Sequence, residues 1–166
     1  MDETRKIRVL LADDHLVVRA GIRQFLELEK DIEVVSEADD GEQAKQKIEE
    51  IKPDVAVLDI QMPKATGIEV TRHIRSNRLP VGVLILTAYE DDPYVTAVLK
   101  AGANGYVLKT ARPSEIIQAV RDVYAGKSVL DRAIISKVMA HLSAPAGPSI
   151  TINLSDREME VLMQAA

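Results

Sequence analysis

Five short runs of apolar, mostly branched residues recur along this chain, and longer stretches with apolar residues at helical spacing separate them. The runs are Ile7–Ala12, Ile32–Ser36, Val55–Leu58, Val81–Leu86 and Gly105–Leu108. Runs that are apolar throughout, rather than alternating, are typical of parallel strands covered by helices on both faces. Repeated strand–helix units indicate a parallel sheet. We therefore expect an α/β fold over Ile7 to about Ala125, an open, doubly wound five-stranded parallel sheet.

The stretches between these runs carry the marks of helices. In the first of them, the predicted apolar face consists of Val17, Val18, Gly21, Ile22 and Phe25. Helix boundaries are indicated by Pro53 after the second stretch, Pro93 in the first turn of the fourth, and Gly126 after the fifth. These signals agree with the strand–helix alternation.

The chain has 166 residues, which is somewhat long for one compact domain and short for two. Leu130–Leu142 shows one apolar helical face, residues 143–149 are a Pro/Gly/Ala/Ser linker, and Ser155 with Glu158 starts a new helical pattern. We expect a domain over 5–126, a linker helix and flexible linker over 127–149, and the start of a second domain, cut short, over 150–166.

Composition excludes several classes of function for these residues. The net charge is −5, which disfavours nucleic-acid binding because phosphates require clustered Lys and Arg. The charged N-terminal residues are unlike a signal peptide, and the longest apolar run, Val81–Leu86, is far shorter than the ~20 residues of a membrane-spanning helix. The absence of Cys suits the reducing cytoplasm. We expect a cytoplasmic protein with no membrane contact.

Charged and hydroxyl residues follow four of the five apolar runs. Asp13 and Asp14 follow the first, Asp59 follows the third, Thr87 ends the fourth, and Lys109 follows the fifth. Ligand sites in open α/β sheets form at the carboxyl ends of strands, so these groups should meet. Converging carboxylates repel one another, and a small set of carboxylates with remaining waters suits Mg²⁺ better than Ca²⁺. The pattern predicts a pocket for a metal-bound phosphoryl group.

The carrier of this phosphoryl group is predicted to be Asp59. The sequence has no Gly-x-x-x-x-Gly-Lys-Ser/Thr loop to hold a nucleotide, whereas carboxylates can themselves form aspartyl phosphates. Attack by a positioned carboxylate requires mainly alignment and charge neutralisation, which the neighbouring groups can supply.

The ordered set of these residues resembles the receiver domain of two-component response regulators. The matching residues, within 5–126, are Asp13-Asp14, Asp59-Ile60-Gln61-Met62-Pro63, Gly67, Thr87-Ala88 and Gly105-Tyr106-Val107-Leu108-Lys109. Two further segments are similar to the NarL/FixJ type, whose output domain is a LuxR-type helix-turn-helix. They are Asp13-Asp14-His15 with Arg19-Ala20-Gly21, and Leu154–Leu162.

The resemblance implies a flavodoxin-like receiver fold with strand order 2-1-3-4-5. It also implies that Asp59 takes its phosphoryl group from a phosphohistidine of a sensor histidine kinase. Mg²⁺ would be held by Asp13, Asp14, Asp59 and the backbone carbonyl of Gln61.

The remaining site residues receive their roles from the same resemblance. Lys109 would pair with one phosphoryl oxygen and the Thr87 hydroxyl would donate to another, while Tyr106 would rotate inward as a conformational switch. Gln61 and Tyr89 would line the mouth of the site and set the rate of water attack. The chain would thus be a signalling switch rather than an enzyme. It would control transcription, contact DNA only through the missing output domain, and form a homodimer on phosphorylation.

Some residues depart from the family pattern or allow another interpretation. Thr110 stands where many receivers have a proline after the site lysine, and Ala65 where a larger apolar residue is common. Tyr106 also suits plain core packing, and His15 suits a solvated first-turn position.

Two other classes of protein compete with the phosphorylated switch. One is a Mg²⁺-dependent phosphohydrolase of the haloacid-dehalogenase kind, which places a second Asp two residues after its nucleophile, where this chain has Gln61. The other is an unphosphorylated receiver-like module, which usually lacks the site Asp or Lys. Both residues are present here.

Overall fold

The computed structural model describes residues 5–88 and 92–130, except the side chains of residues 92–94. Its strands form a single parallel sheet in the order β2-β1-β3-β4-β5-β6. The strands are β1 (Ile7–Ala12), β2 (Ile32–Ala38), β3 (Val55–Leu58), β4 (Gly82–Thr87), β5 (Gly105–Leu108) and β6 (Val129–Leu130). The predicted order 2-1-3-4-5 is confirmed, and β6 extends the sheet at the β5 edge.

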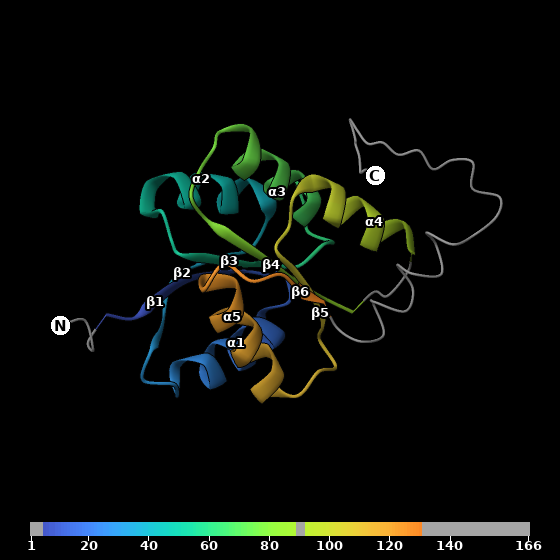
Figure 1. Cartoon of the computed structure of the whole chain (residues 1–166). Coiled ribbons are helices and arrows are strands. Elements are labelled where there is room, and N and C mark those ends of the chain that lie inside the picture. Colours follow the sequence, from blue (N-terminus) through green and yellow to red (C-terminus); the bar gives the residue numbers. More distant parts are fainter. Residues whose placement is uncertain (1–4, 89–91, 131–166) are drawn as a thin grey trace.

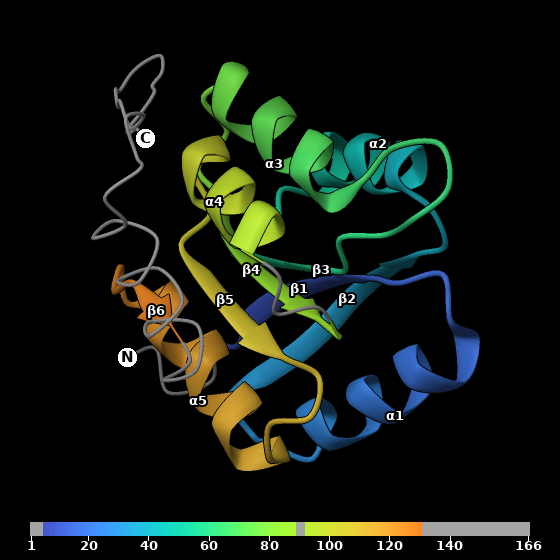
Figure 2. The same ribbon diagram turned by 90° about the vertical axis from the view of Figure 1, so that its right-hand side faces the viewer.

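Helices cover both faces of this sheet. They are α1 (Leu16–Glu27), α2 (Gly41–Ile51), α3 (Gly67–Ser76), α4 (Asp92–Ala101) and α5 (Pro113–Tyr124). Figures 1 and 2 show α1 and α5 together on one face, and α2, α3 and α4 on the other. None of the helices in the described part is long and apolar enough to cross a membrane.

Alternate residues of each strand face two separate cores. In β1, Leu10 packs with the core under α2, α3 and α4, whereas Val9 and Leu11 pack with the core under α1 and α5. In β3, all four residues are buried. This two-sided burial explains why the strands read as continuous apolar runs.

Local signals define where the helices begin. The Asp40 carboxylate accepts a hydrogen bond from the Gln43 amide at 2.8 Å at the start of α2. Thr66 and Glu69 form a capping box at the start of α3, and Pro113 occupies the first turn of α5. The cap of α3 places its first turn directly after the loop that follows β3.

Two expectations differ from the structure. Val17 and Val18 were expected on the buried face of α1, but Val17 is 85% exposed and Val18 is also exposed. Ile22 is buried as predicted, and the helix turns Arg19 and Leu26 inward beside it, because these positions lie at helical spacing around Ile22. Leu130, the first residue of the predicted linker helix, lies in β6 and pairs with Tyr106 of β5. The rest of that predicted helix, the linker and the start of the second domain lie outside the described residues.

Candidate functional site

The predicted site residues lie together at the carboxyl edge of the sheet. β1 lies beside β3, and the Asp59 amide donates a hydrogen bond to the Ala12 carbonyl at 3.0 Å. On the other side, the Lys109 amide donates to the Thr87 carbonyl at 2.7 Å. The sheet register therefore brings together residues that are 46 and 50 positions apart (59 − 13 and 109 − 59).

Lys109 links the two buried carboxylates of the site. Its Nζ atom lies 2.7 Å from Asp13 Oδ2 and 3.3 Å from Asp59 Oδ2. The side chains of Asp13 and Asp59 are only 3% and 4% exposed. Buried carboxylates require a compensating charge, and a single ammonium group serves both. One negative charge of the pair is left for a further cation.

The electrostatics of Asp59 reflect this crowding. Burial is the main cause that raises the pKa of Asp59, and the negative charge of Asp13 adds to it, while Lys109 and the Ile60 amide oppose the rise. Burial would lower the pKa of Lys109, but the hydrogen bond to Asp13 and the charges of Asp59 and Asp13 outweigh burial and raise it. Lys109 is therefore protonated at neutral pH.

The donor set fits a divalent metal ion. Asp13, Asp14, His15 and Asp59 each offer a ligand atom, and these atoms lie within 4.8 Å of one another. Asp13 and Asp59 are buried, while Asp14 and His15 are exposed and open the group to solvent. Carboxylate oxygens with access to water suit Mg²⁺, which keeps several waters. The three carboxylates of this group, Asp13, Asp14 and Asp59, are the ones that the sequence predicts as metal ligands.

His15 contacts this group more closely than its sequence position indicates. It is the residue before α1, and its ring Nδ1 lies 3.2 Å from Asp13 Oδ1 and 3.3 Å from Asp14 Oδ1. Its backbone amide also donates to Asp13 Oδ1 at 2.8 Å. The side chain is well exposed, as the first-turn interpretation expects, but it touches both carboxylates.

The backbone after β3 holds Asp59 against the start of α3. Asp59 Oδ1 accepts from the Ile60 amide at 2.9 Å, and the Gly67 amide donates to the Ile60 carbonyl at 2.9 Å. A Cβ atom on Gly67 would lie 2.2 Å from the Asp59 carbonyl oxygen. Gly67 thus permits a close approach that any larger residue would block.

The remaining predicted residues occupy defined places around the carboxylates. Thr87 is fully buried at the end of β4, and Tyr106 is fully buried in β5 within the core under α2, α3 and α4. This burial agrees with core packing, and a switch role for Tyr106 stays a prediction. Gln61 is exposed at the loop after β3, and Tyr89 lies outside the described residues.

Thr110 and Ala65, the two departures from the family pattern, both lie in segments that the structure describes. The described residues contain no cis peptide bond, so the bond before Thr110 is trans. Ala65 is buried, and a Cβ atom on Gly41 would lie 2.0 Å from the Ala65 carbonyl oxygen. The loop after Asp59 therefore packs closely on the start of α2.

Comparison with known proteins agrees with this site. Residues 9–121 match the sequence profile of the response regulator receiver domain. Because this match covers more than half of the chain, the protein belongs to the response regulator receiver domain family.

The similar proteins of known role are response regulators of the NarL/LuxR type. The chain is 38% identical over 163 residues to the oxygen regulatory protein NreC of Staphylococcus haemolyticus, covering 94% of this chain and 75% of that protein. It is also 38% identical over 157 residues to the transcriptional regulatory protein LiaR of Bacillus subtilis, covering 94% and 74%.

Solved structures show the same fold. The receiver domain of the response regulator NarL from Mycobacterium tuberculosis superposes with a TM-score of 0.73 at 40% identity, covering 74% of this chain and 99% of that one. A LuxR-family response regulator from Aurantimonas superposes with a TM-score of 0.78 at 34% identity, covering 82% and 97%. The fold, the family and the site agree on a receiver of two-component signalling, and nothing supports the phosphohydrolase alternative.

Proposed function

We propose that Asp59 is the residue that accepts the phosphoryl group, from a phosphohistidine of a sensor histidine kinase. The observation that carries this proposal is the placement of Asp59, which is buried, central in the sheet and 3.3 Å from the Lys109 ammonium. In the transfer, an Asp59 carboxylate oxygen forms a bond to phosphorus. The bond from phosphorus to the histidine nitrogen breaks, and the imidazole keeps the electron pair.

The acidic residues are proposed to hold Mg²⁺ during this transfer. Asp13, Asp14 and Asp59 would supply carboxylate oxygens, and Gln61 its backbone carbonyl. When bound, the ion would neutralise charge on the phosphoryl oxygens. Asp13 also orients Lys109, whose Nζ atom is closer to Asp13 than to Asp59, and so holds the ammonium beside the acceptor.

Lys109 and Thr87 are proposed to recognise the phosphoryl group once it is on Asp59. The Lys109 ammonium would pair with one oxygen, and the Thr87 hydroxyl would donate to another. The hydrogen bond from the Lys109 amide to the Thr87 carbonyl, at 2.7 Å, keeps their strand ends adjacent. Their donors would therefore meet the new charge together.

The conformational response is proposed to pass through Thr87 and Tyr106. Both are fully buried on neighbouring strands, β4 and β5. A shift of the Thr87 hydroxyl toward the phosphoryl group would change the packing beside Tyr106, and the surface of α4, β5 and α5 would repack. Gln61, at the exposed mouth of the site, would influence the rate of water attack.

The output is proposed to be transcriptional control in the cytoplasm. Relatives of this chain include transcriptional regulatory proteins, and a solved structure of the response regulator RcsB contains dimers bound to DNA. We expect DNA binding through a LuxR-type output domain, and a homodimer on phosphorylation. Sedimentation with and without beryllofluoride tests the dimer, and an unchanged mass would count against it.

The proposed acceptor is tested by incubating the chain with acetyl phosphate and Mg²⁺. Intact mass should rise by one phosphoryl group that is labile in alkali, and Asp59→Asn should abolish the gain. The control is Asp122→Asn, which changes a carboxylate on α5 that is not part of the site. This variant should leave the gain unchanged. A gain that survives Asp59→Asn, or a wild-type chain that takes up no group, would overturn the proposal.

A further inference from the structure

Arg19 is a buried cation beside the site that none of the roles above uses. It lies on α1 and is only 7% exposed. Its Nη1 atom donates to the Asp13 carbonyl at 2.7 Å, to the Ala38 carbonyl at 3.2 Å and to Asp39 Oδ1 at 2.6 Å. Its Nε atom donates to Glu37 Oε1 at 2.8 Å. The guanidinium therefore joins the ends of β1 and β2.

These contacts hold the backbone of Asp13 on both sides. The carbonyl of Asp13 accepts directly from Arg19. The amide of Asp13 donates to the Ala38 carbonyl at 3.1 Å, and this same carbonyl accepts from Arg19. The Asp13 carboxylate is in turn held by the His15 amide at 2.8 Å. A displacement of the guanidinium would remove the hydrogen bonds that it makes to the Asp13 and Ala38 carbonyls.

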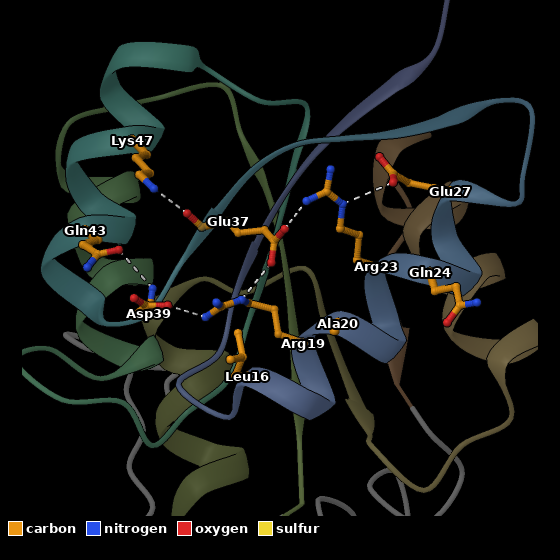
Figure 3. Close-up of a pocket in the computed structure, with 10 residues that line it drawn as sticks. All are labelled: Leu16, Arg19, Ala20, Arg23, Gln24, Glu27, Glu37, Asp39, Gln43 and Lys47. Carbon is orange, nitrogen blue, oxygen red and sulfur yellow. Dashed lines mark hydrogen bonds and ion pairs between the residues drawn. The ribbon is translucent and has the colours of Figure 1, made fainter.

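Acidic partners balance the charge of Arg19. Figure 3 shows its guanidinium directed at Glu37 and Asp39. These residues line a hollow of about 690 Å³, whose other lining residues lie mostly on α1 and α2. If the charge of Arg19 were not balanced, its repulsion would weaken the binding of a metal ion to Asp13. With two carboxylates beside it, Arg19 supplies hydrogen bonds to the strand ends without adding net positive charge at the site.

We propose that Arg19 is a positioning residue that places the Asp13 carboxylate for Mg²⁺ and for Lys109. The proposal rests on the proposed function, in which Asp13 is a metal ligand. Arg19 would act through the backbone and not by touching the ion. Outer residues that orient metal ligands typically contribute about 10- to 100-fold in metal affinity. Because Arg19 contacts the backbone of Asp13 and not its carboxylate, its contribution to metal affinity should be smaller than that.

Arg23 offers a matched control on the same helix. It forms ion pairs with Glu27 and Glu37, so Arg23→Gln removes a partner of Glu37 as Arg19→Gln does. Among the described residues, the side-chain hydrogen bonds to the Asp13 and Ala38 carbonyls come from Arg19 and not from Arg23. A difference between the two variants therefore reports on the strand ends rather than on Glu37.

The first measurement is amide hydrogen exchange in the metal-free chain. The His15 amide is bonded to the Asp13 carboxylate, so its exchange rate reports on the position of that carboxylate. Arg19→Gln should speed this exchange by about tenfold, and Arg23→Gln should leave it unchanged. Arg19→Lys keeps the charge but lacks the planar fork, and should give an intermediate rate. It also replaces Arg19→Gln if that variant does not fold.

The second measurement is the Mg²⁺ dissociation constant, from calorimetric titration of folded protein. Arg19→Gln should weaken binding by about three- to tenfold, with Arg23→Gln unchanged. Unchanged His15 exchange and unchanged Mg²⁺ affinity in the Arg19 variants would overturn the proposal, even if they unfold more easily. Failure of the wild-type chain to bind Mg²⁺ would instead overturn the metal site. The exchange data would then still decide whether Arg19 holds Asp13.

Discussion

Gly67 shows how strictly single residues control the geometry around Asp59. A Cβ atom at position 67 would lie 2.2 Å from the Asp59 carbonyl oxygen, and a backbone atom cannot yield as a flexible side chain does. Gly21, on the exposed side of α1, has no atom within 4 Å of the same added Cβ. The two glycines therefore give opposite expectations for the same substitution.

Gly67→Ala should lower the free energy of unfolding by about 1–3 kcal/mol through overpacking and slow phosphorylation by acetyl phosphate. Gly21→Ala should raise the free energy of unfolding by up to about 1 kcal/mol, because alanine is the better helix former. Urea unfolding of both variants checks this. Equal stability of Gly67→Ala and the wild type would contradict the close approach.

Asp59 carries a stability cost that a neutral residue removes. Burial and the charge of Asp13 raise its folded-state pKa above the ordinary value of 3.8, so the folded protein loses stability as pH rises from 3.8 through the raised pKa. Asp59→Asn should therefore stabilise the metal-free chain at pH 7, by on the order of 1 kcal/mol, and not below pH 3.8.

The control for this pH dependence is Asp31→Asn. The hydrogen bond from Arg121 lowers the pKa of Asp31, so this carboxylate stabilises the fold above pH 3.8 and ceases to do so as pH falls through its lowered pKa. Asp31→Asn should thus destabilise the chain at pH 7. Denaturant titrations at acid and neutral pH, without metal, compare the two. If the stability of Asp59→Asn and of Asp31→Asn depended on pH in the same way, the opposite pKa shifts of Asp59 and Asp31 would be refuted.

At the scale of elements, Arg75 ties α3 to the segments that lead into β4 and β5. Its guanidinium donates to the carbonyls of Gly102 at 2.9 Å and Val81 at 3.0 Å, and to Asn104 Oδ1 at 2.6 Å. Asn104 Oδ1 also accepts from the Val83 amide at 2.8 Å. Because these partners are neutral, burial lowers the pKa of Arg75.

Arg75→Met should leave these partly buried acceptors without their donor and lower the free energy of unfolding by about 2–3 kcal/mol. Arg72→Met, at an exposed position on the same helix, should change it by less than about 0.5 kcal/mol. Thermal unfolding followed by circular dichroism measures both. Similar losses in the two variants would show that the ties made by Arg75 contribute little.

At the scale of the whole molecule, Mg²⁺ binding at the proposed acidic site should be coupled to folding. The unfolded chain does not bring Asp13, Asp14 and Asp59 within reach of one ion, so Mg²⁺ should bind the folded state alone. Such binding stabilises by about 2.7 kcal/mol at a concentration 100 times the dissociation constant. Mg²⁺ should raise the melting temperature, and removal by a chelator should reverse the rise. A similar rise in Asp59→Asn would place the ion elsewhere.

The sequence alone determined the strand–helix alternation and the set Asp13, Asp14, Asp59, Thr87 and Lys109. Such a prediction is possible because strands buried on both faces have a distinctive composition, and the carboxyl ends of parallel strands meet at one edge. Position in the chain then suffices to bring these groups together, whatever the details of packing.

Only the tertiary structure decided which groups are buried and what they contact. Val17 and Ile22 have similar apolar side chains on α1, yet the first is exposed and the second buried, since helical spacing fits more than one face. The pairing of Lys109 with both Asp13 and Asp59, and the reach of Arg19 to the ends of two strands, depend on long side chains that meet partners distant in sequence. The spacing of residues along a chain does not encode such contacts, because they arise only once the sheet and its helices have packed.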